Sequence, residues 1–437
     1  MIEQLYNAYL QSHAVTTDSR AITPGCLFFA FRGEHFDGNA FAPQALEQGA
    51  ALCVISDADY KVDDRCIVVD DVLATLQELA RHHRRHLEIP VIGITGTNGK
   101  TTTKELVTAV LSKRYRTSAT KGNFNNHLGV PLTLLAIPED TELAIVEMGA
   151  NHPGEIASLC SIADPDCGLI TNVGRAHLEG FGSFEGVIRT KTELYRHLAA
   201  KEGTVFVNAD NATLMEHLPR NTRNITYGTA ARADVHGSHV ADNPFMKFYF
   251  EVRDNVYTVQ THLLGAYNFD NCMAAVAVGL HFGVEPWDIK EAIEEYTPTN
   301  QRSEYRETAR HNRLYLDCYN ANPSSMAAAI ASFRSLALPT THYPLPTKMA
   351  VIGGMHELGA AEQQEHERVI GQLEACPLER VLLVGPEWAP LPHPDNMLLF
   401  PDTEAVATYL KEHPVSDATI LVKGSNTNRL WTLEKLL

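Results

Sequence analysis

A glycine-rich loop directly after an apolar run is the clearest chemical feature of the sequence. Residues 91–95 are rich in β-branched side chains, and the loop that follows is Gly96, Thr97, Asn98, Gly99, Lys100, Thr101 and Thr102. Glycines let the backbone approach phosphate oxygens, and the N–H groups of the loop and of the helix it opens supply positive potential. Lys100 can reach the β and γ phosphates of a nucleotide, and the Thr101 hydroxyl can bind Mg²⁺. The loop therefore indicates a nucleotide-phosphate site.

The loop departs from the strict P-loop pattern at its first position. That pattern begins with glycine, and the corresponding residue here is Ile94. The alternative is a glycine-rich turn that arose by chance. The order of strand, loop and helix expected around it favours the phosphate site.

Two polar residues follow other apolar runs of the same region. Glu147 follows the run 143–146, and His177 comes soon after the run 168–171. Ligands of open parallel sheets bind beyond the carboxyl ends of the strands, where a carboxylate can hold Mg²⁺. Either residue alone could be structural. Together with the loop they predict a site for a metal ion and a triphosphate.

The elements that must position these residues alternate along the middle of the chain, over 87–300. Apolar runs at 91–95, 143–146 and 168–171 suit strands, and helices are expected over about 101–111 and 268–282. Continuous apolar strands between helices indicate a parallel sheet that is covered on both faces.

The flanking segments read as two further α/β units. In residues 1–86, three short apolar runs precede a helix that Asp71 can cap and that runs to about His86. Their ranges are 27–31, 51–55 and 66–69. Residues 301–437 alternate again and predict a second doubly wound sheet. Its expected strands are 314–316, 348–352, 380–384 and 419–422, with a proline-rich loop at 339–346.

Composition limits the class of protein. A length of 437 residues suggests two to four domains, and 36 Lys and Arg against 53 Asp and Glu give a net charge of −17. This charge argues against a nucleic-acid or anionic-membrane surface. We expect no signal peptide and no membrane span, and the eight scattered Cys suit reduced thiols in a cytoplasmic protein.

Residues 93–102 resemble the ATP loop of the Mur ligases and their folylpolyglutamate synthetase relatives, whose loop also lacks the outer glycine. Four more segments carry the resemblance, which covers essentially the whole chain in order. They are residues 17–20 with 28–38, residues 123–133, residues 317–326 and residues 357–359. Within the family they resemble the member that joins D-alanyl-D-alanine to UDP-N-acetylmuramoyl-tripeptide.

The resemblance implies an α/β fold of three domains: an N-terminal UDP-binding unit (1–86), a central parallel-sheet ATPase (87–300) and a C-terminal Rossmann-like unit (301–437). It also implies an ATP- and Mg²⁺-dependent ligase of peptidoglycan precursor synthesis that acts as a monomer. The tripeptide carboxylate would be phosphorylated first, and the dipeptide amine would attack the acyl phosphate. Neither step requires a nucleophile from the protein, so catalysis would be positioning and charge neutralisation.

The resemblance also assigns roles to residues of this sequence. Catalytic residues would be Lys100, Glu147, His177 and Lys191. Mg²⁺ ligands would be Thr101, Glu147, His177 and, if carbamylated, Lys191. Nucleotide contacts would come from the loop 96–102 and from Asn268, Asn271, Arg302 and Asp317. Substrate contacts would come from Asp18, Ser19, Arg20, Asn125, Asn126, Asn320 and Asn322.

Two departures leave the amine substrate open. Gly354 stands where the family usually has Asp, and Asn426 stands where Arg is frequent. One alternative is an amide-forming ligase of the same family with another amino-acid substrate, although the N-terminal segment argues against the folate class, which lacks a UDP-binding domain. Another is a regulatory protein with a decayed site. Lys191 could also be an unmodified lysine.

Overall fold

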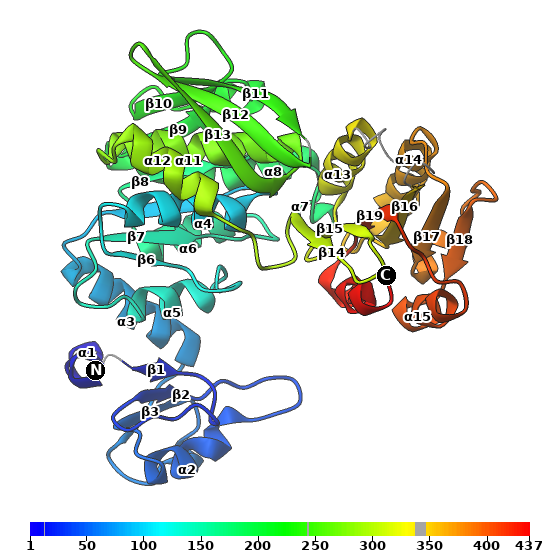
Figure 1. The fold of residues 1–437 in the computed structure, drawn as a ribbon. Helices are drawn as coiled ribbons and strands as arrows, with labels where there is room; N and C mark the ends of the chain where they lie inside the picture. The colour runs from blue at the N-terminus through cyan, green and yellow to red at the C-terminus, as the bar shows by residue number, and fades with distance from the viewer. Residues whose placement is uncertain (13, 243, 337–346) are drawn as a thin grey trace.

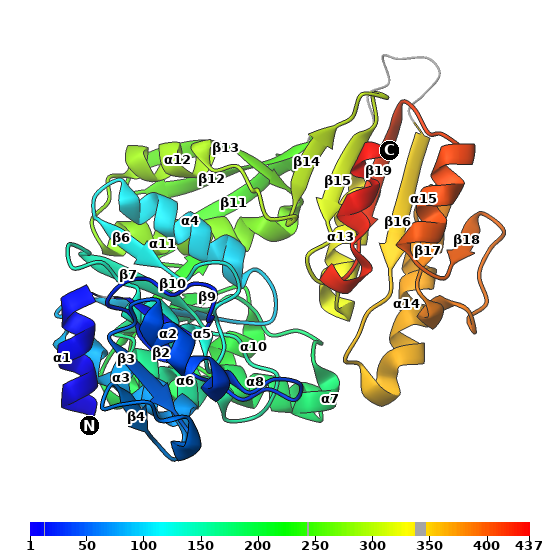
Figure 2. The same ribbon diagram turned by 90° about the horizontal axis from the view of Figure 1, so that it is seen from below.

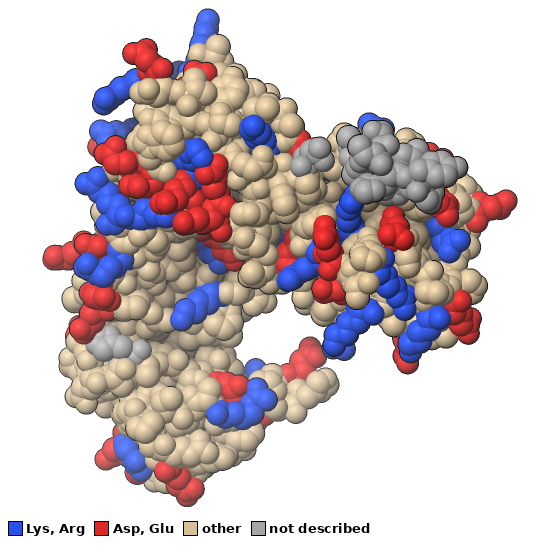
Figure 3. All heavy atoms as spheres, in the orientation of Figure 1, with Lys and Arg blue, Asp and Glu red and all other residues tan. Residues whose placement is uncertain are grey.

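The computed structural model describes residues 1–12, 14–242, 244–336 and 347–437. The chain forms three sheets in sequence order, each with its own helices (Figure 1). The expected mixed α/β architecture of three units is confirmed. The central unit adjoins both others, which face each other across an opening (Figures 1 and 3). The proline-rich segment 339–346 lies outside the described residues, so the loop expected there stays a prediction.

The N-terminal sheet has four parallel strands in the order β1-β2-β3-β4. They are β1 (Val15–Thr16), β2 (Leu27–Phe29), β3 (Leu52–Ile55) and β4 (Cys66–Val68), with helices α1 (Ile2–Ser12), α2 (Ala42–Glu47) and α3 (Val72–His86). The Asp71 carboxylate caps α3 by accepting from the Ala74 N–H at 3.0 Å, as the sequence predicts. Helix α3 also packs on helices of the central unit, so one hydrophobic core spans the two units.

The central sheet has nine strands in the order β13-β12-β11-β10-β9-β8-β5-β7-β6. Its parallel part contains β5 (Val91–Thr95), β6 (Thr117–Ala119), β7 (Leu143–Glu147), β8 (Cys167–Ile170), β9 (Thr204–Asn208), β10 (Arg223–Gly228) and β11 (Val235–Asp242). Beyond it, β12 (Phe245–Val252) and β13 (Asn255–Leu264) continue the sheet with antiparallel pairing. This antiparallel extension is absent from the sequence-based expectation. Every other residue of β12 is buried from Met246 to Phe250, which is typical of a strand with one solvated face.

Helices cover both faces of the central sheet, as expected (Figures 1 and 2). One face carries α4 (Lys100–Ser112), α11 (Phe269–His281) and α12 (Pro286–Glu295), which share a core with β5 and β7. The other carries α5 (Gly129–Leu135), α6 (Glu155–Ala163) and α9 (Glu193–Ala200). Three further helices belong to the unit: α7 (Leu178–Phe181), α8 (Phe184–Lys191) and α10 (Ala212–Glu216). Because strands β5, β7 and β8 are neighbours, their carboxyl ends meet at one edge.

The C-terminal sheet has the order β14-β15-β19-β16-β17-β18. Strand β14 (Glu304–Glu307) pairs antiparallel with β15 (Arg313–Asp317). The others are parallel: β16 (Thr347–Gly353), β17 (Arg380–Val384), β18 (Met397–Phe400) and β19 (Ala418–Lys423), with helices α13 (Pro323–Ser335), α14 (Glu362–Glu374) and α15 (Thr403–Glu412). Separate cores lie on its two faces. None of the helices in the described ranges has the length and apolar character needed to cross a membrane.

Candidate active site

The glycine-rich loop lies between the end of β5 and the start of α4, as predicted. Gly96 has φ +145° and Gly99 has φ +79°, conformations that residues with a side chain rarely adopt. A Cβ on Gly96 would lie 2.0 Å from the Thr171 hydroxyl oxygen, and one on Gly99 would lie 2.4 Å from the Asn271 side-chain oxygen. Backbone conformation and close packing therefore both require glycine at these two positions.

The end of β8 supports the loop through two residues that sequence reasoning missed. The Thr171 hydroxyl donates to the Asn98 carbonyl oxygen at 2.6 Å. The Asn172 side chain accepts from the Asn98 N–H and donates to the Asn98 carbonyl, both at 3.0 Å. The available signal was their position: Thr171 ends the apolar run 168–171, and Asn172 directly follows it.

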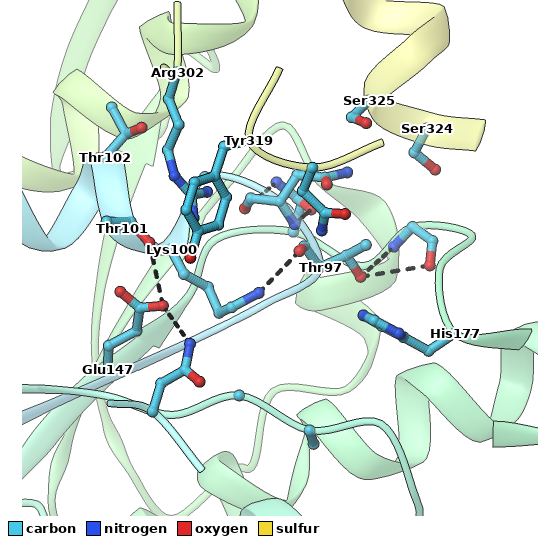
Figure 4. A pocket seen from close by; sticks show the side chains of 18 of the residues that line it. Thr97, Lys100, Thr101, Thr102, Glu147, His177, Arg302, Tyr319, Ser324 and Ser325 are labelled. Carbon is cyan, nitrogen blue, oxygen red and sulfur yellow. Dashed lines mark hydrogen bonds between the residues drawn. The ribbon is translucent and has the colours of Figure 1, made fainter. Parts of the chain in front are cut away.

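Lys100 lies over the loop, where its amine donates to the carbonyl oxygens of Gly96 at 2.9 Å and Thr97 at 3.0 Å (Figure 4). Burial lowers the pKa of the Lys100 amine to about 8, and the nearby Glu147 carboxylate opposes this shift. The amine thus lies over the glycine-rich loop, and no carboxylate among the described residues forms an ion pair with it.

Thr101 and Glu147, two of the predicted metal ligands, are in contact. The Thr101 hydroxyl donates to Glu147 Oε1 at 3.3 Å, and the Asn125 side chain donates to the same oxygen at 2.7 Å. Glu147 is almost fully buried, and its Oε2 has no hydrogen-bond partner in the described chain. A buried carboxylate oxygen without a donor beside a threonine hydroxyl fits a bound Mg²⁺ ion.

The other two predicted metal ligands, His177 and Lys191, make contacts with residues other than Thr101 and Glu147. His177 Nδ1 contacts the Glu357 carboxylate of the C-terminal unit, and burial lowers the pKa of His177. Lys191 is buried, and its amine donates to the Ala150 carbonyl at 3.3 Å. Burial, assisted by the charge of Lys100, holds the pKa of Lys191 well below its usual range. Three or more acidic, His or Cys side chains do not gather into a metal-binding group anywhere in the described ranges.

A cavity of about 760 Å³ lies between the central and C-terminal units. It brings together most of the predicted nucleotide and substrate residues: Thr97, Asn98, Gly99, Lys100, Thr101, Thr102, Asn125, Asn126, Glu147, His177, Asn268, Asn271, Arg302, Asp317 and Asn320. Asp18, Ser19 and Arg20 are not among its lining residues. These three residues lie on the N-terminal unit, where the exposed Arg20 guanidinium pairs with the Asp18 carboxylate at 2.7 Å.

The predicted adenine contacts are fixed by hydrogen bonds. The buried Asn268 side chain donates to the Leu264 carbonyl at 2.8 Å, and the Asn271 side chain donates to Asn268 Oδ1, also at 2.8 Å. Thr103 donates to Asn271 Oδ1 at 3.0 Å. These bonds hold both amides in one orientation beside the loop.

The C-terminal unit adds cavity residues beyond the predicted set, among them Tyr319 and Lys423. The Arg302 guanidinium stacks over the Tyr319 ring at 3.8 Å, and the buried Lys423 amine pairs with the Asp317 carboxylate at 3.0 Å. Tyr319 lies within the segment 317–326 that carried the resemblance, so its position was the signal. Lys423 is the last residue of β19. Its pairing with Asp317 follows from the fact that β15 and β19 are neighbours in the sheet, which the sequence does not show.

The same unit also touches the phosphate loop directly. The Asn322 side chain donates to Asn98 Oδ1 at 2.7 Å, and the Ser324 hydroxyl accepts from the Arg175 N–H at 2.8 Å. The Arg175 guanidinium pairs with the buried Glu365 carboxylate at 2.9 Å. The cavity is therefore built jointly by two units.

Comparison with known proteins identifies this arrangement. Three family models match in chain order: "Mur ligase family, catalytic domain" at residues 11–84, "Mur ligase middle domain" at 94–279 and "Mur ligase, glutamate ligase domain" at 301–426. The UDP-N-acetylmuramoyl-tripeptide–D-alanyl-D-alanine ligase of Bacillus subtilis is 35% identical over 97% of this chain and 92% of its own length. The chain belongs to the Mur ligase family.

Three further relatives are similar to this chain over 97% of its length. The Escherichia coli ligase of the same name is 34% identical over 97% of this chain and 93% of its own. The crystal structure of MurF from Acinetobacter baumannii superposes with a TM-score of 0.86 at 30% identity, covering 97% of this chain and 93% of that one. MurF ligase from Thermotoga maritima, in complex with ADP, gives 0.85 at 28% identity, covering 97% and 96%. The predicted family resemblance is confirmed.

Proposed function

We propose that this Mur ligase joins D-alanyl-D-alanine to UDP-N-acetylmuramoyl-tripeptide at the expense of ATP, in peptidoglycan precursor synthesis. The observation that carries the proposal is the shared cavity, in which the phosphate loop of the central unit faces Arg302 and Asp317 of the C-terminal unit. Support comes from the names of the full-length relatives in Bacillus subtilis and Escherichia coli, and from the structural neighbour that binds ADP.

The proposed reaction has two steps. A carboxylate is a poor acyl donor, so the γ-phosphate of ATP is first transferred to the tripeptide carboxylate. The dipeptide amine then attacks the acyl phosphate, and phosphate leaves. Lys100, the loop N–H groups and the start of α4 neutralise the charge of the transferring phosphoryl group, which is the main catalytic requirement of such a transfer. The arrangement of units supplies positioning, because each contributes one side of the cavity.

Thr101 and Glu147 are proposed to hold Mg²⁺, and the unpaired Glu147 oxygen supports this assignment. A bound Mg²⁺ ion neutralises phosphate charge. His177 is proposed for a second ion. Lys191 is proposed as a carbamylation site, because a buried lysine with a lowered pKa holds more of the neutral amine that reacts with carbon dioxide.

Nucleotide contacts are assigned to the loop 96–102 and to Asn268, Asn271, Arg302 and Asp317. The muramoyl tripeptide is assigned to Asn125, Asn126, Asn320 and Asn322, and its UDP part to residues 18–20 on the N-terminal unit. The domain limits 1–86, 87–300 and 301–437 are proposed because each sheet falls within one of these ranges. A cytoplasmic, monomeric enzyme is proposed, since ATP and a nucleotide-linked precursor are its substrates.

A ligation assay tests the substrates. The protein is incubated with ATP, Mg²⁺ and UDP-N-acetylmuramoyl-tripeptide, and phosphate release and product mass are followed with a panel of amines. We expect turnover with D-alanyl-D-alanine and weak or no turnover with single amino acids. Turnover with another amine and none with the dipeptide would replace the proposal by its alternative, a Mur-type ligase with a different amino-acid substrate, which the departures at Gly354 and Asn426 would then explain.

A further inference from the structure

Three parallel strands of the C-terminal sheet end side by side near the cavity. Strand β16 lies between β17 and β19, so the loops that follow all three start at one edge (Figure 2). At this edge Lys423 lines the cavity, and Glu357, in the loop after β16, contacts His177. Polar groups on the loops after β16 and β17 therefore lie next to the site without lining the cavity described above.

Glu387 places a carboxylate in this edge. It belongs to the short 3-10 turn η5 (Pro386–Trp388) that follows β17, and Trp388 anchors the turn by being fully buried. The Glu387 side chain is only 11% exposed, and its Oε1 lies 3.5 Å from His356 Nδ1. Its Oε2 is buried and has no hydrogen-bond partner among the described residues. A buried carboxylate oxygen without a donor is unfavourable, so Glu387 has hydrogen-bonding capacity that the described residues leave unused.

Two glycines make room for this oxygen. A Cβ on Gly354 would lie 2.4 Å from Glu387 Oε2, and a Cβ on Gly385 would lie 2.2 Å from it. The C–C and C–O bond lengths of a carboxyl group place its oxygens about 2.4 Å from the preceding carbon. Glu387 Oε2 therefore lies as far from a Cβ at position 354 as the carboxylate oxygens of an aspartate at that position would lie from their own Cβ. Position 354 is one of the two departures noted in the sequence.

Other polar groups complete the edge on its exposed side. His356 Nε2 lies 3.0 Å from the Thr427 hydroxyl, which is 2.6 Å from the Ser425 hydroxyl. The His356 side chain is 44% exposed, so it forms the rim beside the buried carboxylate. An ammonium group carries three N–H donors and a positive charge, which match a carboxylate whose Oε2 lacks a donor among the described residues. A divalent cation fits less well, since the described chain places no group of three metal-binding side chains here.

We propose that Glu387, with His356 at its rim, receives the amino group of the incoming dipeptide and is a specificity-determining residue of the enzyme. Position 354, after β16, can be glycine in this chain because Glu387, after the neighbouring strand β17, supplies the carboxylate. The inference rests on the proposed ligase function. Phosphorylation of the tripeptide carboxylate does not involve the amine, so it should proceed without Glu387.

The first test separates the two half-reactions in the isosteric variant Glu387→Gln. Acyl phosphate is trapped with hydroxylamine in the absence of dipeptide, and complete ligation is measured as a function of dipeptide concentration. We expect hydroxamate formation within about twofold of wild type and a KM for D-alanyl-D-alanine raised about tenfold or more, because a charge-assisted hydrogen bond to the amine is lost. An unchanged KM, or an equal loss in both half-reactions, would overturn the proposal.

The second test moves the carboxylate. Gly354→Asp alone should impair ligation and lower thermal stability, because two carboxylates would compete for one space. Combining it with Glu387→Ala should return the dipeptide KM to within about threefold of wild type. A double variant no better than Glu387→Ala alone would refute the relocation. If the wild-type protein accepts another amine but not D-alanyl-D-alanine, the proposed substrate is wrong. The KM for that other amine is then compared between wild type and Glu387→Gln, and this comparison still decides the role of Glu387.

Discussion

Single residues of the site were predictable from the sequence where their own chemistry suggests a ligand, and were missed where they contact other residues of the protein. The charge of Lys100, the hydroxyl of Thr101 and the carboxylate of Glu147 have chemistry that points to a phosphate and a cation, and the structure places all three at one strand edge. The side chains of Thr171 and Asn172 instead hydrogen-bond to the Asn98 backbone. That role follows from the neighbouring positions of β5 and β8, which the order of residues in the chain does not reveal.

Asp270 illustrates a residue whose environment sets a pH dependence of stability. It lies in the first turn of α11, between the two asparagines assigned to adenine. Burial raises the pKa of the Asp270 carboxyl from 3.8 to about 6, and a hydrogen bond from the Asn208 side chain opposes the shift. Between these two pH values the folded protein binds more protons at this group than the unfolded chain does. Its contribution to the free energy of unfolding therefore falls as pH rises from about 4 to about 6 and stays low above that.

We therefore expect Asp270→Asn to stabilise the protein at pH 7 by about 1–2 kcal/mol, since the amide cannot ionise. The gain should shrink as pH falls below about 6 and be nearly absent near pH 4. Chemical denaturation of both proteins at several pH values measures this difference. A gain that is constant over pH 4 to 7, or a loss at pH 7, would show that burial of the charge does not control stability here.

Elements were predicted best where the strands are apolar throughout. The ranges of β5 and β17 match the expected runs, and the other expected strands of the central and C-terminal units lie within about two residues of the observed ones. In the central unit, β6 and the strands β9 to β13 were not predicted, although β9 is buried throughout. Strands β12 and β13 carry polar residues on a solvated face and lack the continuous apolar character of the predicted parallel strands.

The loop between β5 and α4 provides a prediction at the scale of an element. In Gly96→Ala the new methyl group would collide with the Thr171 hydroxyl at a backbone angle that alanine rarely adopts. We expect a KM for ATP raised about tenfold or more and a stability loss of about 1–3 kcal/mol. Steady-state kinetics and thermal unfolding measure the two effects.

Gly371→Ala is the matched control for that variant. Gly371 lies inside α14, and a Cβ there would meet nothing within 4 Å. The control should leave ATP kinetics unchanged and stabilise the protein by about 0.5–1 kcal/mol, because alanine favours a helix interior. Equal effects of both substitutions on ATP kinetics would argue against a special role of the loop backbone.

At the scale of the whole molecule, the order of three units followed from the family resemblance, but the contacts between units did not. Asn98 meets Asn322, and His177 meets Glu357, across long separations in the chain. Such pairs depend on how two independently folded sheets are oriented, and no local pattern of residues encodes that. The family resemblance predicted that nucleotide contacts come from both units, but the residue pairs that join the two sides of the cavity were visible only in the structure.

Because ATP and substrate residues are divided between two units, turnover should depend on their approach. Arg175→Ala removes the pairing of Arg175 with the buried Glu365 carboxylate, which keeps Arg368 as a second partner at 2.7 Å. We expect a larger radius of gyration in small-angle scattering for the free variant, compaction of wild type by an ATP analogue with tripeptide, and a lowered kcat in the variant. Identical scattering of wild type with and without ligands would contradict a closing motion.

The central claim is that the γ-phosphate of ATP is transferred to the substrate carboxylate and not to water. The most direct measurement uses UDP-N-acetylmuramoyl-tripeptide with ¹⁸O in its terminal carboxylate, ligated to D-alanyl-D-alanine, with mass analysis of the released phosphate. If an acyl phosphate forms, one labelled oxygen passes from the carboxylate to the phosphate, and Lys100→Ala should abolish this transfer while leaving the fold intact. Amide product accompanied by unlabelled phosphate would contradict the account.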